Sequence, residues 1–153
     1  MRIRDEQGGS LVEFALGSSV LLMTLFGIFA ICLALYSYVF VAEAAREATR
    51  YALVRGSSCT GFSDCGITSA ELNTYVKNLG YPGINTSKLS ATATWLSPSA
   101  NVPTTWSACT PCNAPGDAVE VQVTYTFPLG IPFWPKSGSL IHMSSSSQMT
   151  ISQ

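Results

Sequence analysis

The sequence predicts an α+β chain: a long N-terminal membrane-spanning helix followed by a small domain with a short helix and a three-stranded antiparallel sheet. No charged residue stands between Glu13 and Glu43, and as a helix this run is about 43 Å long, against about 30 Å for a hydrocarbon core. Beyond Gly56, three segments alternate apolar and polar residues with the period of half-buried strands. Charged residues make up 11% of the chain, against roughly 25% in ordinary soluble domains.

The apolar run continues without a helix breaker into AEAAREATRYALVRG, residues 42–56. We therefore predict one helix over residues 11–54, within an N-terminal helical region 9–55 whose membrane span covers about 14–41. A cleavable secretory signal fits less well, because its apolar core has only about 7–15 residues. Ser10 and Glu13 have the spacing of a capping box, which predicts the helix start there.

The remaining residues, 56–153, form a separate domain with one predicted short helix. Thr68 and Glu71 form a T-x-x-E capping box, and Gly80 and Pro82 end the helix. Its apolar stripe consists of Leu72, Tyr75, Val76 and Leu79.

Strands are predicted at KLSATATWLS (88–97), AVEVQVTYTF (118–127) and LIHMSSSSQMTIS (140–152). Because each has one apolar face, the sheet needs a cover. The short helix offers its apolar stripe as one part of this cover. The outer half of the long helix offers a second stripe of small residues, which consists of Val41, Ala45, Ala48 and Ala52. Residues 98–116 read as a loop. The Pro-rich connection 128–136 either caps the core or places its aromatic rings at the membrane interface.

Four cysteines follow the span, namely Cys59, Cys65, Cys109 and Cys112. In a small Ser- and Thr-rich domain they favour disulfides and an oxidising compartment, although reduced thiols in a cytosolic domain remain the alternative. This places the C-terminal domain outside the cytoplasm and the N-terminus inside. We expect the local pairs Cys59–Cys65 and Cys109–Cys112, with a crossed pairing as the rival. The six-residue separation of Cys59 and Cys65 is unusual for zinc, so no metal site is expected.

The sequence contains no arrangement that predicts catalysis. His142 is the only histidine and stands among serines, and no Gly-rich phosphate loop is present. The net charge of −1 gives no reason to expect a nucleic-acid partner. We therefore expect no enzymatic activity, no cofactor and no small-molecule substrate.

Two segments carry a family resemblance. GGSLVEFAL, residues 8–16, resembles the processing region of type IV pilin-like proteins, and AEAAREATRYALVRG resembles the segment after the span in TadE-like proteins of the tight-adherence (Tad) pilus system. The resemblance implies a pilin-like fold, a leader peptide at residues 1–8, and cleavage between Gly8 and Gly9 by a prepilin peptidase. Glu13 is then the fifth residue of the mature chain.

The same resemblance implies a minor pilin or pseudopilin that is held in the bacterial inner membrane and drawn into an adhesive pilus or its assembly base. Its partners are other pilins or pseudopilins and the pilus assembly platform. The alternatives without a processing or assembly role are that Gly8 and Gly9 form a hinge and that Glu13 only caps the helix. The alternative function is a single-pass membrane-anchored extracytoplasmic binding domain that does not enter a filament.

Overall fold

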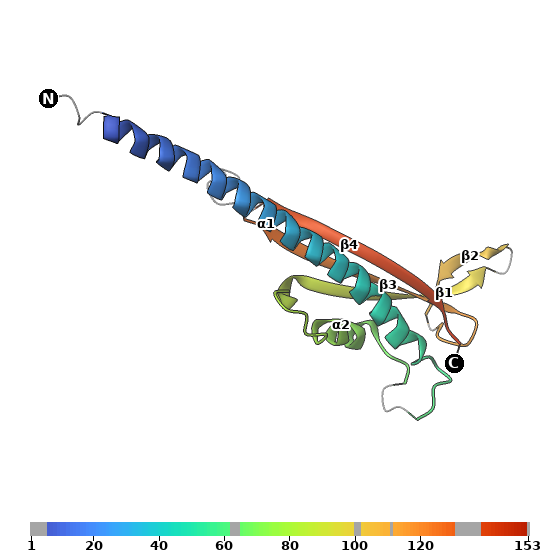
Figure 1. Cartoon of the computed structure of the whole chain (residues 1–153). Helices are drawn as coiled ribbons and strands as arrows, with labels where there is room; N and C mark the ends of the chain where they lie inside the picture. The colour runs from blue at the N-terminus through green and yellow to red at the C-terminus, as the bar shows by residue number, and fades with distance from the viewer. Residues whose placement is uncertain (1–5, 62–64, 100–101, 111, 131–138, 153) are drawn as a thin grey trace. The chain divides into compact units, whose positions relative to one another are not determined.

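The structure is a computed structural model, and it describes residues 6–61, 65–99, 102–110, 112–130 and 139–152. In chain order its elements are α1 (Glu6–Leu53), α2 (Ser69–Lys77), the 3-10 helix η1 (Thr86–Lys88), β1 (Leu89–Ser99), β2 (Val102–Ala108), β3 (Ala118–Leu129) and β4 (Ser139–Thr150) (Figure 1). The chain divides into two compact units. The first comprises residues 1–36 and 128–141, and the second residues 37–127 and 142–153.

The long N-terminal helix is present as expected, but it begins earlier than the sequence predicts. Helix α1 starts at Glu6, so Gly8, Gly9 and Ser10 lie inside it. The prediction of a capping box formed by Ser10 and Glu13 is therefore wrong. Each glycine costs a helix only about 1 kcal/mol relative to alanine, whereas extending a formed helix adds one hydrogen bond per residue. The two glycines are thus too weak a barrier to set the boundary.

The sheet is antiparallel with the strand order β2-β1-β3-β4, which confirms the α+β class but corrects the expected strand count from three to four. Strands β1 and β3 pair continuously from Leu89 opposite Tyr125 to Leu96 opposite Ala118. The missed strand, β2, lies in the segment predicted as a loop and pairs only with the end of β1, where Pro98 stands opposite Trp106.

Strand β2 was not predicted because it is an edge strand whose described side chains show no buried face. Its residues 105–108 are all exposed, so its sequence shows no alternation of buried and solvated positions. Pro103 also favours a loop, although proline is tolerated on edge strands because their outer N–H groups need no partner in the sheet. The calls on Ile131, Phe133 and Trp134 in the connection 128–136 fall outside the described residues.

The core of the second unit forms between α1, α2 and the sheet, as the apolar stripes predict. The stripe of Val41, Ala45, Ala48 and Ala52 is buried, and it is widened by Phe40 and Ala44. Small residues let the helix backbone approach closely. The buried strand positions of this core are Leu89, Ala91, Ala93, Leu96, Ala118, Val119, Val121, Val123, Tyr125 and Met143.

Helix α2 also covers part of a sheet edge. Its predicted capping box is present, because Thr68 Oγ1 accepts from the Glu71 N–H and the Glu71 carboxylate accepts from the Thr68 N–H. Before β2 begins to pair, β1 has no strand on that side. There, Asn73 Oδ1 accepts from the Ala91 N–H at 3.0 Å and Ser69 Oγ from the Ala93 N–H at 3.1 Å. These side chains replace the missing strand, so the edge does not attract another chain.

Candidate functional site

The N-terminal part of α1 carries the candidate processing and assembly residues. Gly8, Gly9 and Glu13 lie within two turns of the helix, and all three are exposed. A Cβ atom added at either glycine would meet nothing within 4 Å. The segment is therefore open to a peptidase or to another subunit.

The apolar surface that follows Glu13 is exposed on all sides of the helix, which is unusual for an element of a water-soluble protein. Helix α1 is long and apolar enough to cross a membrane, and a helix that is hydrophobic all round belongs in lipid or inside a helix bundle. Its exposed large side chains up to residue 29 are Leu11, Val12, Phe14, Leu16, Val20, Leu21, Leu22, Met23, Leu25, Phe26, Ile28 and Phe29. This surface fits a membrane location.

The hydroxyl groups within this run are satisfied by the helix itself. Ser18, Ser19 and Thr24 donate to backbone carbonyl oxygens one turn earlier, at 3.0, 2.8 and 2.8 Å. Such bonds let hydroxyl side chains enter hydrocarbon without an unpaired donor. Glu13 is different, because a carboxylate at the bilayer centre costs at least about 2.5–3.5 kcal/mol. The charge therefore prefers the interface unless a cation pairs with it.

Past the span, α1 becomes charged on one side. Glu43 and Arg46 form an ion pair at 2.8 Å, which is worth about 0.2–0.5 kcal/mol on an exposed helix. Among the described residues, the analogous pair of Glu47 and Arg50 does not form. Instead, the Tyr75 hydroxyl of α2 donates to Glu47 Oε1 at 3.4 Å.

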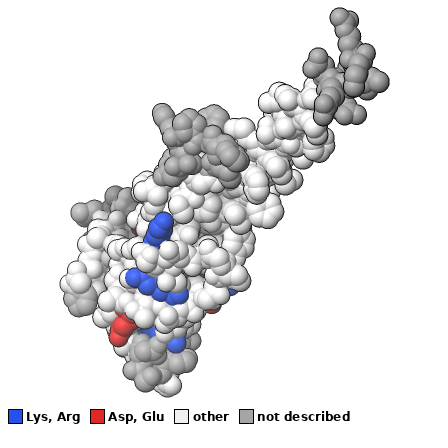
Figure 2. All heavy atoms as spheres, turned by 90° about the vertical axis from the view of Figure 1, so that its left-hand side faces the viewer, with Lys and Arg blue, Asp and Glu red and all other residues white. Residues whose placement is uncertain are grey.

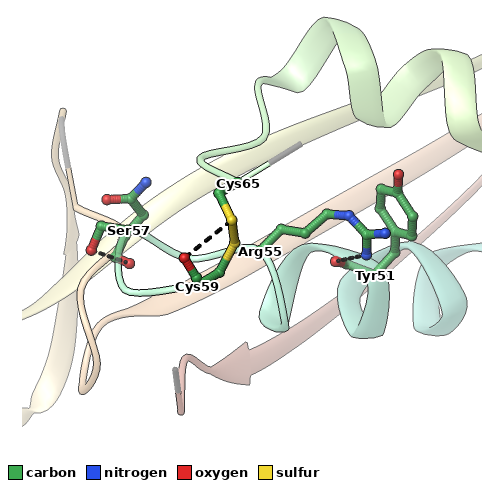
Figure 3. Close-up of a disulfide and its surroundings, with 6 residues drawn as sticks. Tyr51, Arg55, Ser57, Cys59 and Cys65 are labelled. Atoms are coloured by element: carbon green, nitrogen blue, oxygen red, sulfur yellow. Dashed lines mark hydrogen bonds between the residues drawn. A yellow bond between two sulfur atoms is a disulfide. The ribbon is translucent and has the colours of Figure 1, made fainter. Parts of the chain in front are cut away.

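An aromatic cluster joins the end of α1 to α2. The Tyr51 and Tyr75 rings stack with their centroids 3.8 Å apart. The Arg55 guanidinium lies 3.5 Å from the Tyr51 centroid, and Figure 3 shows these two side chains together. Burial, followed by the nearby Glu47 carboxylate, raises the pKa of the Tyr75 phenol, while Arg55 lowers it. Sequence reasoning assigned Tyr75 to the core stripe but missed this cluster, because nothing in the local pattern pairs α2 with residues 51 and 55.

The four cysteines after the span are joined as two local disulfides, Cys59–Cys65 and Cys109–Cys112, each with its Cα atoms 5.7 Å apart. The first closes the loop after α1 (Figure 3) and the second the loop after β2. The Ser57 N–H donates to the Asn113 carbonyl at 2.8 Å, which ties the two loops together. Cys32, exposed on α1, is the free cysteine of the described residues.

Peptide mapping under non-reducing conditions should recover these two pairs from the full-length protein. The reason is that each pair is held at bonding distance by its own short loop, whereas a crossed pairing would have to rearrange both loops. The matched measurement is the same digest after reduction, in which both linked peptides should separate. Recovery of four free thiols from membranes would contradict an extracytoplasmic location for this domain.

Comparison with known protein families finds a match in the N-terminal part of the chain. The family model for TadE-like proteins matches residues 8–50. The matched segment includes Gly8, Gly9, Glu13 and the whole uncharged run of α1, and it ends before the disulfide-linked loops. No curated protein and no solved structure matches the chain.

Proposed function

We propose that this chain, TadE-like over residues 8–50, is a minor pilin or pseudopilin that takes part in assembling a Tad-type adhesive pilus. The observation that carries the proposal is the combination of an exposed, uncharged helix surface with a single carboxylate, Glu13, at its start. The role is structural rather than enzymatic. Its partners are other pilins or pseudopilins, the assembly platform and a prepilin peptidase.

In this proposal α1 holds the chain in the inner membrane, with the N-terminus in the cytoplasm. The disulfide-linked second unit then lies in an oxidising extracytoplasmic compartment, where its two bonds are stable. The apolar side chains of α1 serve two environments in turn. They contact lipid before assembly and the helices of neighbouring subunits afterwards.

Glu13 favours the move of a subunit from lipid into the filament, because its charge has a partner only in the filament. In lipid, the carboxylate keeps the start of α1 near the membrane interface, because moving an unpaired charge inward is costly. Cleavage after Gly8 creates a free amine at Gly9. An amine of this kind on a neighbouring subunit can pair with Glu13 and remove the cost of leaving the interface.

Cleavage supplies the first test. Mass spectrometry of the intact protein, extracted from membranes of a host that has the peptidase, should show a mature chain beginning at Gly9. Protein from the same host without the peptidase is the control and should retain residues 1–8. A chain that begins at Met1 in both hosts would remove the main support for the pilin assignment.

That result would favour the alternative, a membrane-anchored extracytoplasmic binding domain outside any filament. A cavity of about 280 Å³ in the second unit is compatible with such a role. It lies between the start of α2 and the Cys109–Cys112 loop, beside Trp95. A plain anchor needs no processing before its span, so the N-terminus separates the two functions.

A further inference from the structure

We propose that two adjoining hollows around Trp95, in the second unit, bind a neutral glycan. The first hollow is the cavity between the start of α2 and the Cys109–Cys112 loop, and the second continues from it onto the junction of β1 and β2. We call the two hollows together the Trp95 site. All of its lining residues belong to the second unit, and the proposal rests neither on the pilin assignment nor on cleavage after Gly8.

The two hollows are contiguous because they share part of their walls. Their volumes are about 280 and 310 Å³, and Trp95, Cys109 and Thr110 line both. Volumes of this size lie at the lower end of the range of about 300–1,000 Å³ that is typical of small-molecule sites. Each hollow therefore has space for one small ring, and the Trp95 site as a whole has space for a short chain of rings.

The walls of the Trp95 site combine apolar, aromatic and polar surface. Buried Ile67 and the Cys109–Cys112 disulfide form the apolar part, and the half-buried Trp95 ring adds an aromatic surface. Such a ring fits the C–H face of a sugar, which is apolar although the edge of the sugar ring carries hydroxyls. A mostly apolar wall with a few polar groups is also the usual composition of a small-molecule site.

The polar groups of the Trp95 site have hydrogen-bonding capacity to spare. In the described part of the chain, the Trp95 indole N–H, the Thr110 hydroxyl and the Asn113 side-chain amide form no hydrogen bond. The Ser69 hydroxyl accepts from the Ala93 N–H and keeps its own proton to donate. A tryptophan N–H usually has a partner when it is buried. Sugar hydroxyls, which both donate and accept, match this mixed set of groups.

The lack of charge at the Trp95 site selects a neutral ligand. None of the described residues that line it is acidic or basic. Charge is also sparse on the face of the molecule drawn in Figure 2, where white surface exceeds blue and red. A phosphate or carboxylate would lose its hydration in the site without gaining a charged partner. Sugar hydroxyls instead exchange water for protein hydrogen bonds at little cost.

The backbone of β1 at the Trp95 site is already paired, which argues against a peptide ligand. The Cys109 N–H donates to the Trp95 carbonyl at 3.1 Å, and the Ala93 N–H donates to Ser69 Oγ at 3.1 Å. A peptide that adds to a sheet edge depends on free main-chain groups. The same bonds, together with the disulfide of the neighbouring loop, hold the walls in place, so little conformational entropy is lost on binding.

Titration of the full-length protein with two neutral trisaccharides tests the proposal. One probe is triacetylchitotriose, which carries N-acetyl groups as bacterial wall glycans do, and the other is maltotriose, which carries none. The protein is reconstituted in lipid nanodiscs, because a detergent with a sugar headgroup would compete for the site. Saturation-transfer NMR follows binding up to about 10 mM of each probe, ten times the dissociation constant of roughly 1 mM that marks a weak site.

We expect saturable binding of at least one probe. Trp95→Ala should weaken it about tenfold or more, because it removes both the ring surface and the N–H donor. Asn113→Ala should weaken binding about three- to tenfold through the loss of one hydrogen bond. Trp106→Phe is the matched control, because Trp106 is exposed on β2 and lines neither hollow. Asn113→Ala and Thr110→Val keep the test decisive if Trp95→Ala does not fold.

Binding that Asn113→Ala weakens and Trp106→Phe leaves unchanged would support the Trp95 site. A preference for triacetylchitotriose would then indicate a wall glycan as the source of the ligand, and a preference for maltotriose a glycan of unsubstituted hexoses. Absence of binding by both probes would overturn the proposal, as would binding that Asn113→Ala and Thr110→Val leave unchanged. The mature N-terminus is measured separately, so the proposed function and the Trp95 site can fail independently.

Discussion

Replacing Glu13 by Gln is expected to abolish or sharply reduce pilus assembly while the amount of protein in the membrane stays nearly unchanged. Glutamine keeps the size and helix propensity of glutamate, and Glu13 is exposed on α1. The substitution removes only the charge. Its structural cost is below roughly 1 kcal/mol, the size of a helix-dipole interaction. Counting surface pili by electron microscopy, together with immunoblots of membranes, measures both quantities.

Under the proposed function, the effect is large because only the charged form of Glu13 is costly in lipid and paired with an amine in the filament. A neutral amide can still lie at the interface, but it cannot form a charge-assisted bond with the amine of another subunit. Subunits would then insert normally and fail to associate in register. The loss should therefore appear at assembly rather than at folding.

Ser10→Ala is the matched control, because Ser10 is exposed inside α1 and not at its end. Alanine is the better helix former, so this variant should assemble pili at the level of the unmodified protein. Normal piliation in Glu13→Gln would refute the role of the carboxylate. Loss of piliation in Ser10→Ala, with Glu13→Gln unaffected, would show that the Ser10 hydroxyl matters for assembly and the Glu13 charge does not.

Replacing Leu72 by Ala should lower the free energy of unfolding of the second unit by about 2–5 kcal/mol, the usual range for removing a buried leucine side chain. Leu72 is fully buried on α2, and α2 packs on β1. The truncation leaves a cavity in a small core that has few other large side chains to fill it. Chemical denaturation of the full-length protein in detergent, followed by near-ultraviolet circular dichroism, measures the change.

Thr74→Ala on the same helix is the control. Its side chain is exposed and its hydroxyl bonds only to the Ala70 carbonyl of its own helix, so the expected change is within about 0.5 kcal/mol. In cells, the loss at Leu72 should also lower the amount of protein, because unfolded chains are removed. Equal stabilities for the two variants would mean that α2 is not packed as the structure describes.

The elements that could be predicted are those in which local sequence and burial agree. The uncharged run of α1 is apolar over most of its length, which predicts a long helix in an apolar environment. Strand β3 alternates valine with polar residues so regularly that Val119, Val121 and Val123 are all buried. The Thr68–Glu71 capping box marks the start of α2 within a few residues. In each case the local sequence pattern favours the same conformation that burial in the folded protein requires.

Of the functional features, some follow from the local sequence and others only from the tertiary structure. Gly8, Gly9 and Glu13 could be proposed from their spacing and their position before the apolar run, because the processing that the family resemblance implies acts on a linear segment; their roles stay a prediction. The packing of Tyr81 on Phe40 could not be predicted. The sequence around Tyr81, LGYPG, reads only as a turn, and its position follows from a contact with Phe40, 41 residues earlier.

By itself, therefore, the sequence determined the long apolar helix, the small α+β domain that follows it, and the cysteines available to staple that domain. These depend on composition and period, which are local properties. Only the tertiary structure decided that β2 pairs at the edge of the sheet, that Ser69 and Asn73 cover the open part of β1, and that Tyr51 stacks on Tyr75. The contacts of α2 with β1 and with Tyr51 join separated segments, and their energy is gained only after the core has brought these segments together. Strand β2, in contrast, pairs with the strand directly before it, and no local pattern in the sequence marks that pairing.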